Sequence, residues 1–240
     1  MDVNAILTAQ DVDGPAVDGR VAVVMDVLRA TSTITTALAN GCTGVYPVLS
    51  PDEGHELAAS LVPGSYVLGG ERGGLKIEGF DLGNSPREYT PERISGKALI
   101  MTTTNGTLAI RNCRGSYRVY VSSLLNAPSV ARAAARHGRD VVLVCSGTHG
   151  IFSLEDAYCA GMVADELQAG GARLSDLAEA CRIIFQGYSS SPLDLLHLAE
   201  HGRELIPLGF SGDLEYCARA GSTNVVPVFL DGKIIDEAAL

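Results

Sequence analysis

The residues best suited to chemistry follow short apolar segments that are typical of buried strands. Asp26 comes directly after Val21–Met25, and Arg29 follows three residues later. A carboxylate at this place can bind a divalent cation, and a guanidinium can bind two oxygens of a phosphate. An ordinary ion pair at the start of a helix is the alternative interpretation of the same two residues.

A glycine-rich loop carries a second acid and a second base. Glu71 and Arg72 lie within residues 69–74, where the flanking glycines would let the backbone approach a ligand closely. A nucleotide P-loop is excluded, because Gly74 is not followed by Lys and then Ser or Thr. A flexible loop without function is the alternative.

The loop of residues 79–86 adds a third acid. Asp81 could supply an oxygen ligand to a metal. Asn84 and Ser85 could contact an anion, although capping of the next helix would also explain them.

A threonine-rich turn follows the apolar segment of residues 98–101. Backbone N–H groups at the start of the next helix, together with hydroxyl groups, would bind a phosphate or a sulfonate. The candidates are Thr103, Thr104, Asn105, Gly106 and Thr107. A turn capped by Thr104 or Asn105, with no ligand, is the alternative.

The last of these loops follows residues 141–145. Ser146 and Gly147 could face a ligand, while Glu155 and Asp156 could bind a metal or cap the next helix. A histidine in the same loop, His149, could transfer protons, although a solvated or structural histidine is the commoner case.

These loops need a sheet that brings them to one edge. Apolar segments alternate with helical patterns, which predicts an α/β fold with a largely parallel or mixed sheet and helices on both faces. Residues 154–219 are predicted to be mostly helical, and a hairpin should turn at Asp231-Gly232. The predicted strands are Val21–Met25, 45–49, 66–68, 98–101, 118–121 and 141–145.

The length of 240 residues fits one α/β unit, or two α/β lobes divided near Gly138. The formal charge of −10 and the lack of a basic run exclude nucleic acid as a partner. No apolar segment is long enough to cross a membrane, and no secretory signal starts the chain. The six cysteines are scattered, so we expect them to be reduced in a cytoplasmic protein.

Read together, four segments resemble the 2-phosphosulfolactate phosphatase family. They are DVLRATSTI at 26–34, LGGERGGLKIEGFDLGNSP at 68–86, TTTNGT at 102–107 and CSGTHGIFSLEDAYCAG at 145–161. The resemblance covers residues 15–230. It implies a magnesium-dependent phosphatase that releases phosphate from 2-phospho-3-sulfolactate in coenzyme M biosynthesis, or from a similar small phosphorylated hydroxy acid.

Under this hypothesis, Mg²⁺ would be held by Asp26, Glu71 and Asp81, with Glu155 or Asp156 as a further ligand. Arg29 and Arg72 would bind the anionic oxygens. Direct attack by water and attack by a carboxylate such as Asp26 both remain open.

Two other functions fit the same loops: a non-catalytic module that binds small organic anions, and a phosphoryl or sulfo-group transferase. The expected partner is a small anionic phosphorylated substrate, and assembly into a homo-oligomer is compatible with the sequence.

Overall fold

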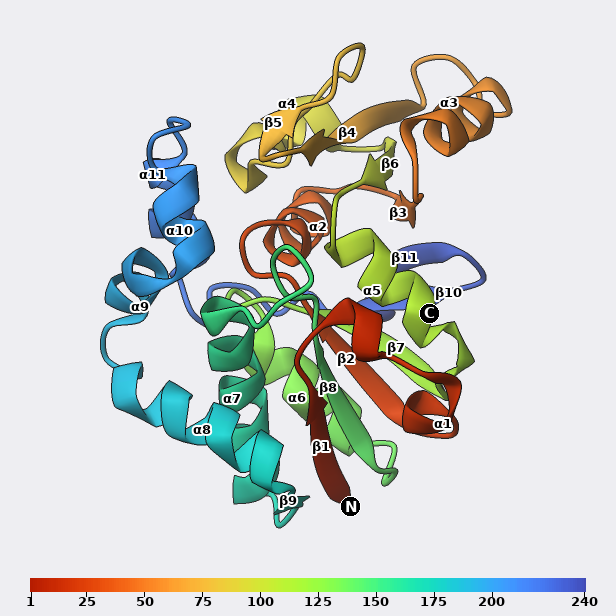
Figure 1. Cartoon of the computed structure of the whole chain (residues 1–240). Helices are drawn as coiled ribbons and strands as arrows, with labels where there is room; N and C mark the ends of the chain where they lie inside the picture. The colour runs from red at the N-terminus through yellow and green to blue at the C-terminus, as the bar shows by residue number, and fades with distance from the viewer.

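A single mixed sheet of 11 strands organises the protein, in the order β5-β4-β6-β3-β11-β10-β7-β2-β8-β1-β9 (Figure 1). The computed structural model describes all 240 residues. The strands are β1 (Asp2–Ile6), β2 (Val21–Met25), β3 (Gly44–Pro47), β4 (Tyr66–Arg72), β5 (Leu75–Lys76), β6 (Ala98–Thr102), β7 (Arg118–Ser122), β8 (Val141–Cys145), β9 (Arg173–Leu174), β10 (Pro227–Leu230) and β11 (Lys233–Asp236).

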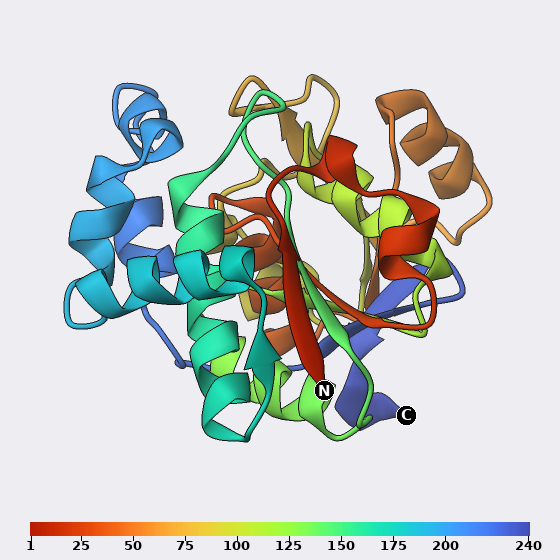
Figure 2. The ribbon, with the colours of Figure 1, turned by 60° about the horizontal axis from the view of Figure 1, so that its bottom comes forward.

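Eleven α-helices surround this sheet, and the longest of them are α7 and α8. They are α1 (Gly14–Val17), α2 (Ala30–Ala39), α3 (Pro51–Ala59), α4 (Pro91–Ile94), α5 (Gly106–Asn112), α6 (Ala127–Ala135), α7 (Leu154–Ala169), α8 (Asp176–Tyr188), α9 (Pro192–Leu198), α10 (Glu200–Leu205) and α11 (Ser211–Cys217). Figure 2 shows α7 to α11, drawn in teal and blue, gathered on one side of β1 and β8.

The sheet contains two groups of parallel strands. One group consists of β7, β2, β8, β1 and β9, and the other of β3, β6 and β4. The hairpin of β10 and β11 joins them through antiparallel pairing, with β10 next to β7 and β11 next to β3. The predicted α/β fold with a mixed sheet is therefore confirmed.

Alternate residues of β2 explain why helices cover both faces. Val21, Val23 and Met25 belong to the core that contains α6 and α7, whereas Ala22 and Val24 belong to the core that contains α2 and α5. All five residues are buried. A strand that is buried on both faces has a continuous apolar sequence, which is why β2 was recognisable.

A smaller core lies under α3. It consists of Val48, Ala58, Leu68, Phe80 and Ile100, and it packs α3 against β4 and β6. Ser50 caps the start of this helix, because its hydroxyl accepts a hydrogen bond from the Glu53 backbone N–H at 3.1 Å. The Glu53 carboxylate reaches back to the N–H of Leu49 at 2.7 Å.

Three strands were not predicted. In β1, exposed Asp2 and Asn4 alternate with buried Val3 and Ala5, so the strand has no apolar run. The strands β5 and β9 have two residues each, which is too short for a sequence pattern. The hairpin at Asp231-Gly232 is confirmed.

Gly138 lies in the turn between α6 and β8, and a domain division there stays a prediction. None of the helices combines the length and the apolar character that crossing a bilayer requires.

Candidate active site

A cavity of about 710 Å³ lies where the two groups of parallel strands end. It brings together residues that are far apart in the sequence. The predicted site residues that line it are Asp26, Arg29, Glu71, Arg72, Asn84, Thr104 and Asn105. The loops after β2, β4 and β6 therefore converge, as the sequence indicates.

Asp26 directly follows β2 and lies in the cavity wall with 8% of its surface exposed. Its Oδ1 accepts a hydrogen bond from the N–H of Ala30 at 3.1 Å, at the start of α2. Burial is the main cause that raises the pKa of Asp26 to about 7, and the negative charges of Glu71 and Glu155 add to it. This carboxylate is therefore close to its protonation midpoint at neutral pH.

Gly106 lets the first turn of α5 approach Asp26. A Cβ atom at this position would lie 2.7 Å from Asp26 Oδ2 and 2.6 Å from the Ala30 side chain. No other residue would fit without moving one of these groups. The role of Gly106 in this geometry is thus to allow close packing against the carboxylate.

Glu71 ties two loops together at the end of β4. Its Oε1 accepts hydrogen bonds from the backbone N–H of Thr104 at 2.8 Å and from its hydroxyl at 3.0 Å. Its Oε2 accepts one from the N–H of Gly74 at 2.9 Å. Glu71 therefore fixes the glycine-rich loop against the threonine-rich turn, and both loops face the cavity.

The two predicted arginines differ in how they are held. Arg29 is 2% exposed, donates to Asp213 Oδ2 at 2.9 Å and to the Gly74 carbonyl at 2.6 Å, and its guanidinium lies 4.1 Å from the Phe210 ring centre. Arg72 is exposed and donates to the Thr102 hydroxyl at 2.9 Å. Arg72 is the more accessible of the two cations.

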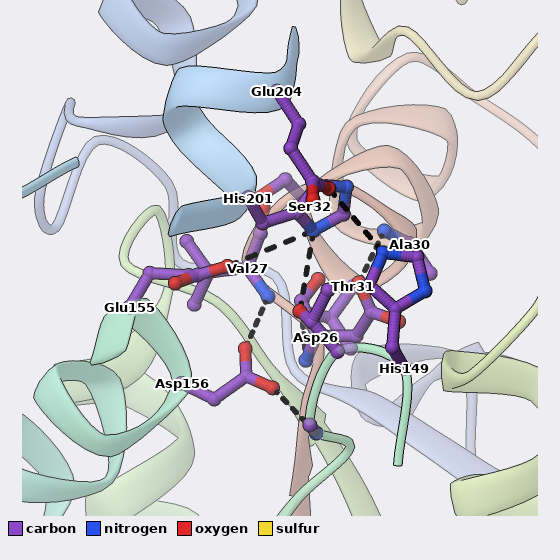
Figure 3. Close-up of polar contacts among 12 residues, drawn as sticks. Asp26, Val27, Ala30, Thr31, Ser32, His149, Glu155, Asp156, His201 and Glu204 are labelled. Carbon is purple, nitrogen blue, oxygen red and sulfur yellow. Dashed lines mark hydrogen bonds and ion pairs between the residues drawn. The ribbon is translucent and has the colours of Figure 1, made fainter. Parts of the chain in front are cut away.

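Two predicted acids lie at the start of α7. The carboxylate of Asp156 accepts hydrogen bonds from Val27 N–H at 2.9 Å and Gly147 N–H at 3.1 Å, so it fastens the loop after β2 to the loop after β8 (Figure 3). Glu155 is buried and lies beside His201, with Oε1 3.7 Å from Nδ1. Burial raises the pKa of both carboxylates, and the charge of Asp26 raises that of Asp156 further.

Asp81 does not join these acids. It is exposed, and its carboxylate accepts a hydrogen bond from the Leu68 N–H at 2.8 Å, within the β4 region. It is not among the residues that line the cavity. The structure therefore separates Asp81 from the group of acids with which the sequence placed it.

Several predicted ligand-binding residues serve the surrounding framework. The hydroxyl of Thr103 accepts from the N–H of Thr107 at 3.2 Å, and the Thr107 hydroxyl donates to the Thr103 carbonyl at 3.1 Å. The Ser85 hydroxyl donates to Asp213 at 2.7 Å.

In the loop after β8, Ser146 is buried and its Oγ has no hydrogen-bond partner, while the Gly147 N–H donates to the Asp156 carboxylate. Ser153 occupies the N-cap position of α7, but its side chain makes no cap hydrogen bond.

The wall formed by the C-terminal third was missed by sequence reasoning. His201, Glu204, Leu205, Pro207 and Leu208 line the cavity opposite the strand ends. The spacing of His201 and Glu204 places both on one face of a helix, but this is an ordinary pattern in a surface helix. No motif marked the segment.

Comparison with known proteins places this chain in a family. The family model described as 2-phosphosulpholactate phosphatase matches residues 6–232. The chain therefore belongs to the 2-phosphosulpholactate phosphatase family. As a member, it is a phosphoric monoester hydrolase.

Relatives with known names agree along the whole chain. A protein of Symbiobacterium thermophilum named probable 2-phosphosulfolactate phosphatase is 49% identical over 220 residues, covering 90% of this chain and 94% of its own. Proteins with the same name from Clostridium beijerinckii and Clostridium perfringens are 37% and 40% identical, and each alignment covers at least 96% of either chain.

The donor set of this phosphatase suits a hard divalent cation. Asp26, Glu71 and Glu155 are buried carboxylates, and the nearest buried cation, Arg29, is already paired with Asp213. No group of three or more His, Cys, Asp or Glu side chains is placed to hold a metal by itself. A hard divalent cation can take one or two protein carboxylates and complete its shell with water and phosphate oxygens.

Two histidines supply groups that can move protons. His149 has a φ of +52° and lies 3.4 Å from Glu204 through its Nε2. The Nδ1 of His201 lies 3.4 Å from the Thr148 hydroxyl. Burial lowers the pKa of His201, so its imidazole is mostly neutral at pH 7. Carboxylates, guanidinium groups and imidazoles thus line one cavity. Ester hydrolysis uses groups of these kinds to bind the anion and to transfer protons.

Proposed function

We propose that this protein hydrolyses the phosphate ester of 2-phospho-3-sulfolactate, or of a closely similar phosphorylated hydroxy acid, to the free hydroxy acid and phosphate. The proposal rests on the family and on the names of its relatives. The observation that carries it is the buried Asp26 carboxylate, which shares a cavity with Arg29, Arg72 and two histidines.

The proposed substrate carries a phosphate, a sulfonate and a carboxylate, so most of the binding problem is the compensation of negative charge. Arg72 is the accessible guanidinium that would bind anionic oxygens. The side chains of Thr104 and Asn105 offer further donors on the same wall. Asn84 is buried, and its Oδ1 has no partner, so this amide is available to orient a bound molecule.

We further propose that the enzyme depends on Mg²⁺, held by Asp26 together with Glu71 or Glu155. When bound, the ion would neutralise charge on the phosphoryl oxygens. Asp156 would not bind the ion itself. It would position the site, because its two oxygens hold the loops after β2 and β8 in place. Neither Glu155 nor Asp81 lines the cavity, but the charge of Glu155 acts on Asp26, whereas Asp81 is exposed and is left out of this proposal.

Asp26 has two possible roles in the reaction. As a carboxylate it can attack phosphorus and form an acyl phosphate that water then cleaves, or it can accept a proton from the attacking water. The leaving alkoxide needs a proton in both routes. His149 is the cavity residue that could donate it, because burial keeps His201 mostly neutral, and trapping a phosphoenzyme would favour the first route.

A phosphate-release assay tests the proposal directly. Phosphosulfolactate, phospholactate and phosphoglycolate would each be incubated with the enzyme, with Mg²⁺ or with a chelator. We expect release from phosphosulfolactate at the highest kcat/KM, loss of release with the chelator, and recovery when Mg²⁺ is restored. The variant Glu215→Gln, which changes an exposed carboxylate on α11 that does not line the cavity, is the control and should stay within about threefold of wild type.

Two results would contradict the proposal. If no phosphate is released but the compounds raise the melting temperature, the protein is an anion-binding module. If phosphate leaves only when an acceptor other than water is added, it is a transferase.

A cytoplasmic location is also part of the proposal. All six cysteines are buried and free, as expected for a reducing compartment. The homo-oligomeric state and the place in coenzyme M biosynthesis stay predictions.

A further inference from the structure

A second cavity of about 510 Å³ lies at the end of α5 that points away from the catalytic site. Three arginines line it: Arg111 at the end of α5, Arg114 directly after it, and Arg118 at the start of β7. We propose that this cavity binds a small molecule carrying two or more anionic groups of the phosphate type, separately from the substrate.

The charge of this cavity is opposite to that of the protein as a whole. The chain has a formal charge of −10, yet three guanidinium groups share this wall and Asp231 is the one acid that lines it. Only Arg111 has an ion-pair partner, Glu53 at 3.0 Å, whereas Arg114 and Arg118 have none within the 4.0 Å of a salt bridge. A local excess of positive charge attracts anions even on an acidic protein.

Unpartnered polar atoms point to a missing ligand. The Nε atoms of Arg111 and Arg118 and the Oγ of Ser116 are buried and have no hydrogen-bond partner. Seven side-chain atoms in the whole chain are in this state, and three of them belong to residues of this one cavity. Another, Asn84 Oδ1, belongs to the wall of the catalytic cavity. Buried polar groups normally have partners, so their concentration here indicates that acceptors come from outside the chain.

Aromatic and apolar surface completes the cavity. Tyr117 lines it with 47% of its surface exposed, and the Arg139 guanidinium lies 4.0 Å from the centre of the Tyr117 ring. Arg139 therefore brings a further positive charge next to the wall. Phe229 and Leu230 supply apolar surface on the other side. This lining suits an organic molecule with anionic groups better than a bare inorganic ion.

The two cavities are independent in their residues. None of the residues that line one also lines the other. The helix α5 has seven residues, which corresponds to about 10 Å of length, and it separates the two sites. Substitutions of Arg114 and Arg118 should therefore leave the catalytic machinery intact.

A calorimetric titration with inorganic pyrophosphate, in the presence of a chelator, tests the proposal on the full chain. We expect the double variant Arg114→Gln/Arg118→Gln to bind one pyrophosphate fewer per chain than wild type. Its kcat/KM should remain within about twofold of wild type. Equal numbers of bound pyrophosphate in both proteins would overturn the proposal. It would also be overturned if the variant Arg72→Gln bound no pyrophosphate at all, because all binding would then belong to the catalytic cavity.

Two further variants serve as a control for the loss of positive charge and as a substitute for the double variant. Arg219→Gln removes an exposed arginine that also stacks on a tyrosine, Tyr216 at 4.9 Å, and has no ion pair, so it should bind pyrophosphate as wild type does. If the double variant does not fold, Arg114→Gln alone carries the test, because Arg114 is exposed. We expect at least fivefold weaker binding, about 1 kcal/mol, and an affinity within about twofold of wild type would refute the site.

Discussion

The catalytic cavity has two walls that are built differently. The strand-end wall contains Asp26 and Glu71, whose oxygens accept hydrogen bonds from backbone N–H groups at 2.8 to 3.1 Å. The helical wall contains His201 and Glu204 on α10, and their polar contacts with Glu155, Thr148 and His149 are 3.4 to 3.7 Å long. One wall is fixed by the backbone and the other by side chains.

The difference suggests a division of tasks. Groups that must sit at a defined place relative to phosphorus belong on the rigid wall, because small displacements greatly reduce the rate. The helical wall closes the cavity with Leu205, Pro207 and Leu208. It packs into the main core through Leu205 and Leu214, and one buried ion pair, Arg29 with Asp213, also attaches it. The comparison predicts that the strand-end wall controls turnover and that the attachment controls stability.

The largest expected effect comes from Asp26→Asn. This change keeps the shape but removes the charge and the nucleophile, so kcat should fall about 1000-fold, equivalent to ~4 kcal/mol. Steady-state phosphate release measures it. The matched control is Asp81→Asn, another acid after a strand but outside the cavity, which should stay within about threefold. A variant Asp26→Asn with more than a tenth of the wild-type turnover would remove Asp26 from the mechanism.

The next effect is a dependence of stability on pH. The pKa of Asp26 is raised to about 7, so folding favours the protonated carboxyl. Its contribution is complete below about pH 4 and is lost as the pH rises through about 7, and roughly 3 kcal/mol of this loss falls between pH 5 and pH 8. In the presence of a chelator, the melting temperature should therefore be several degrees lower at pH 8 than at pH 5.

Two controls separate this effect from the general repulsion of an acidic protein. The fall in melting temperature should be clearly smaller in Asp26→Asn. Mg²⁺ added at pH 8 should stabilise wild type more than the variant. Identical pH profiles for the two proteins would show that Asp26 has an ordinary pKa and that the strand-end wall is not strained by its acids.

The smallest of the three effects is expected on the helical wall. Asp213→Asn removes the negative charge that Arg29 and Ser85 contact. The side chains of the ion pair are buried, with 2% exposure for Arg29 and 1% for Asp213. Loss of a charged hydrogen-bond partner should lower the free energy of unfolding by about 2 kcal/mol. Urea denaturation measures this, with Asp194→Asn, an exposed aspartate on α9, as the neutral control. Equal stability of the two variants would mean that the attachment lies elsewhere.

Most of the strand-end wall was predictable because buried parallel strands have a simple sequence signature. The run of residues 141–145 is apolar throughout, and the polar residues that follow such runs meet at the strand ends by the geometry of the fold. Asp81 was misplaced because its loop continues past the strand end and turns its carboxylate back to the Leu68 backbone. Hydrogen bonds of this kind leave no pattern in the sequence.

The helical wall was not predictable for a related reason. Asp213 lies in a short helix, and its partners Arg29 and Ser85 are 184 and 128 residues away. Local patterns report on neighbours within a few turns, and a buried ion pair between distant segments depends on how helices pack. The arginine-lined cavity was missed in the same way, since Arg111, Arg114 and Arg118 have the appearance of ordinary surface residues.

The sequence by itself determined the family, the α/β class and the loops that carry the acids, because these depend on local periodicity and on short motifs. Only the tertiary structure decided which acids share the cavity, that Asp156 braces two loops, and that α10 supplies the opposite wall. These outcomes depend on burial and on the direction of individual side chains, which arise when distant segments pack against each other.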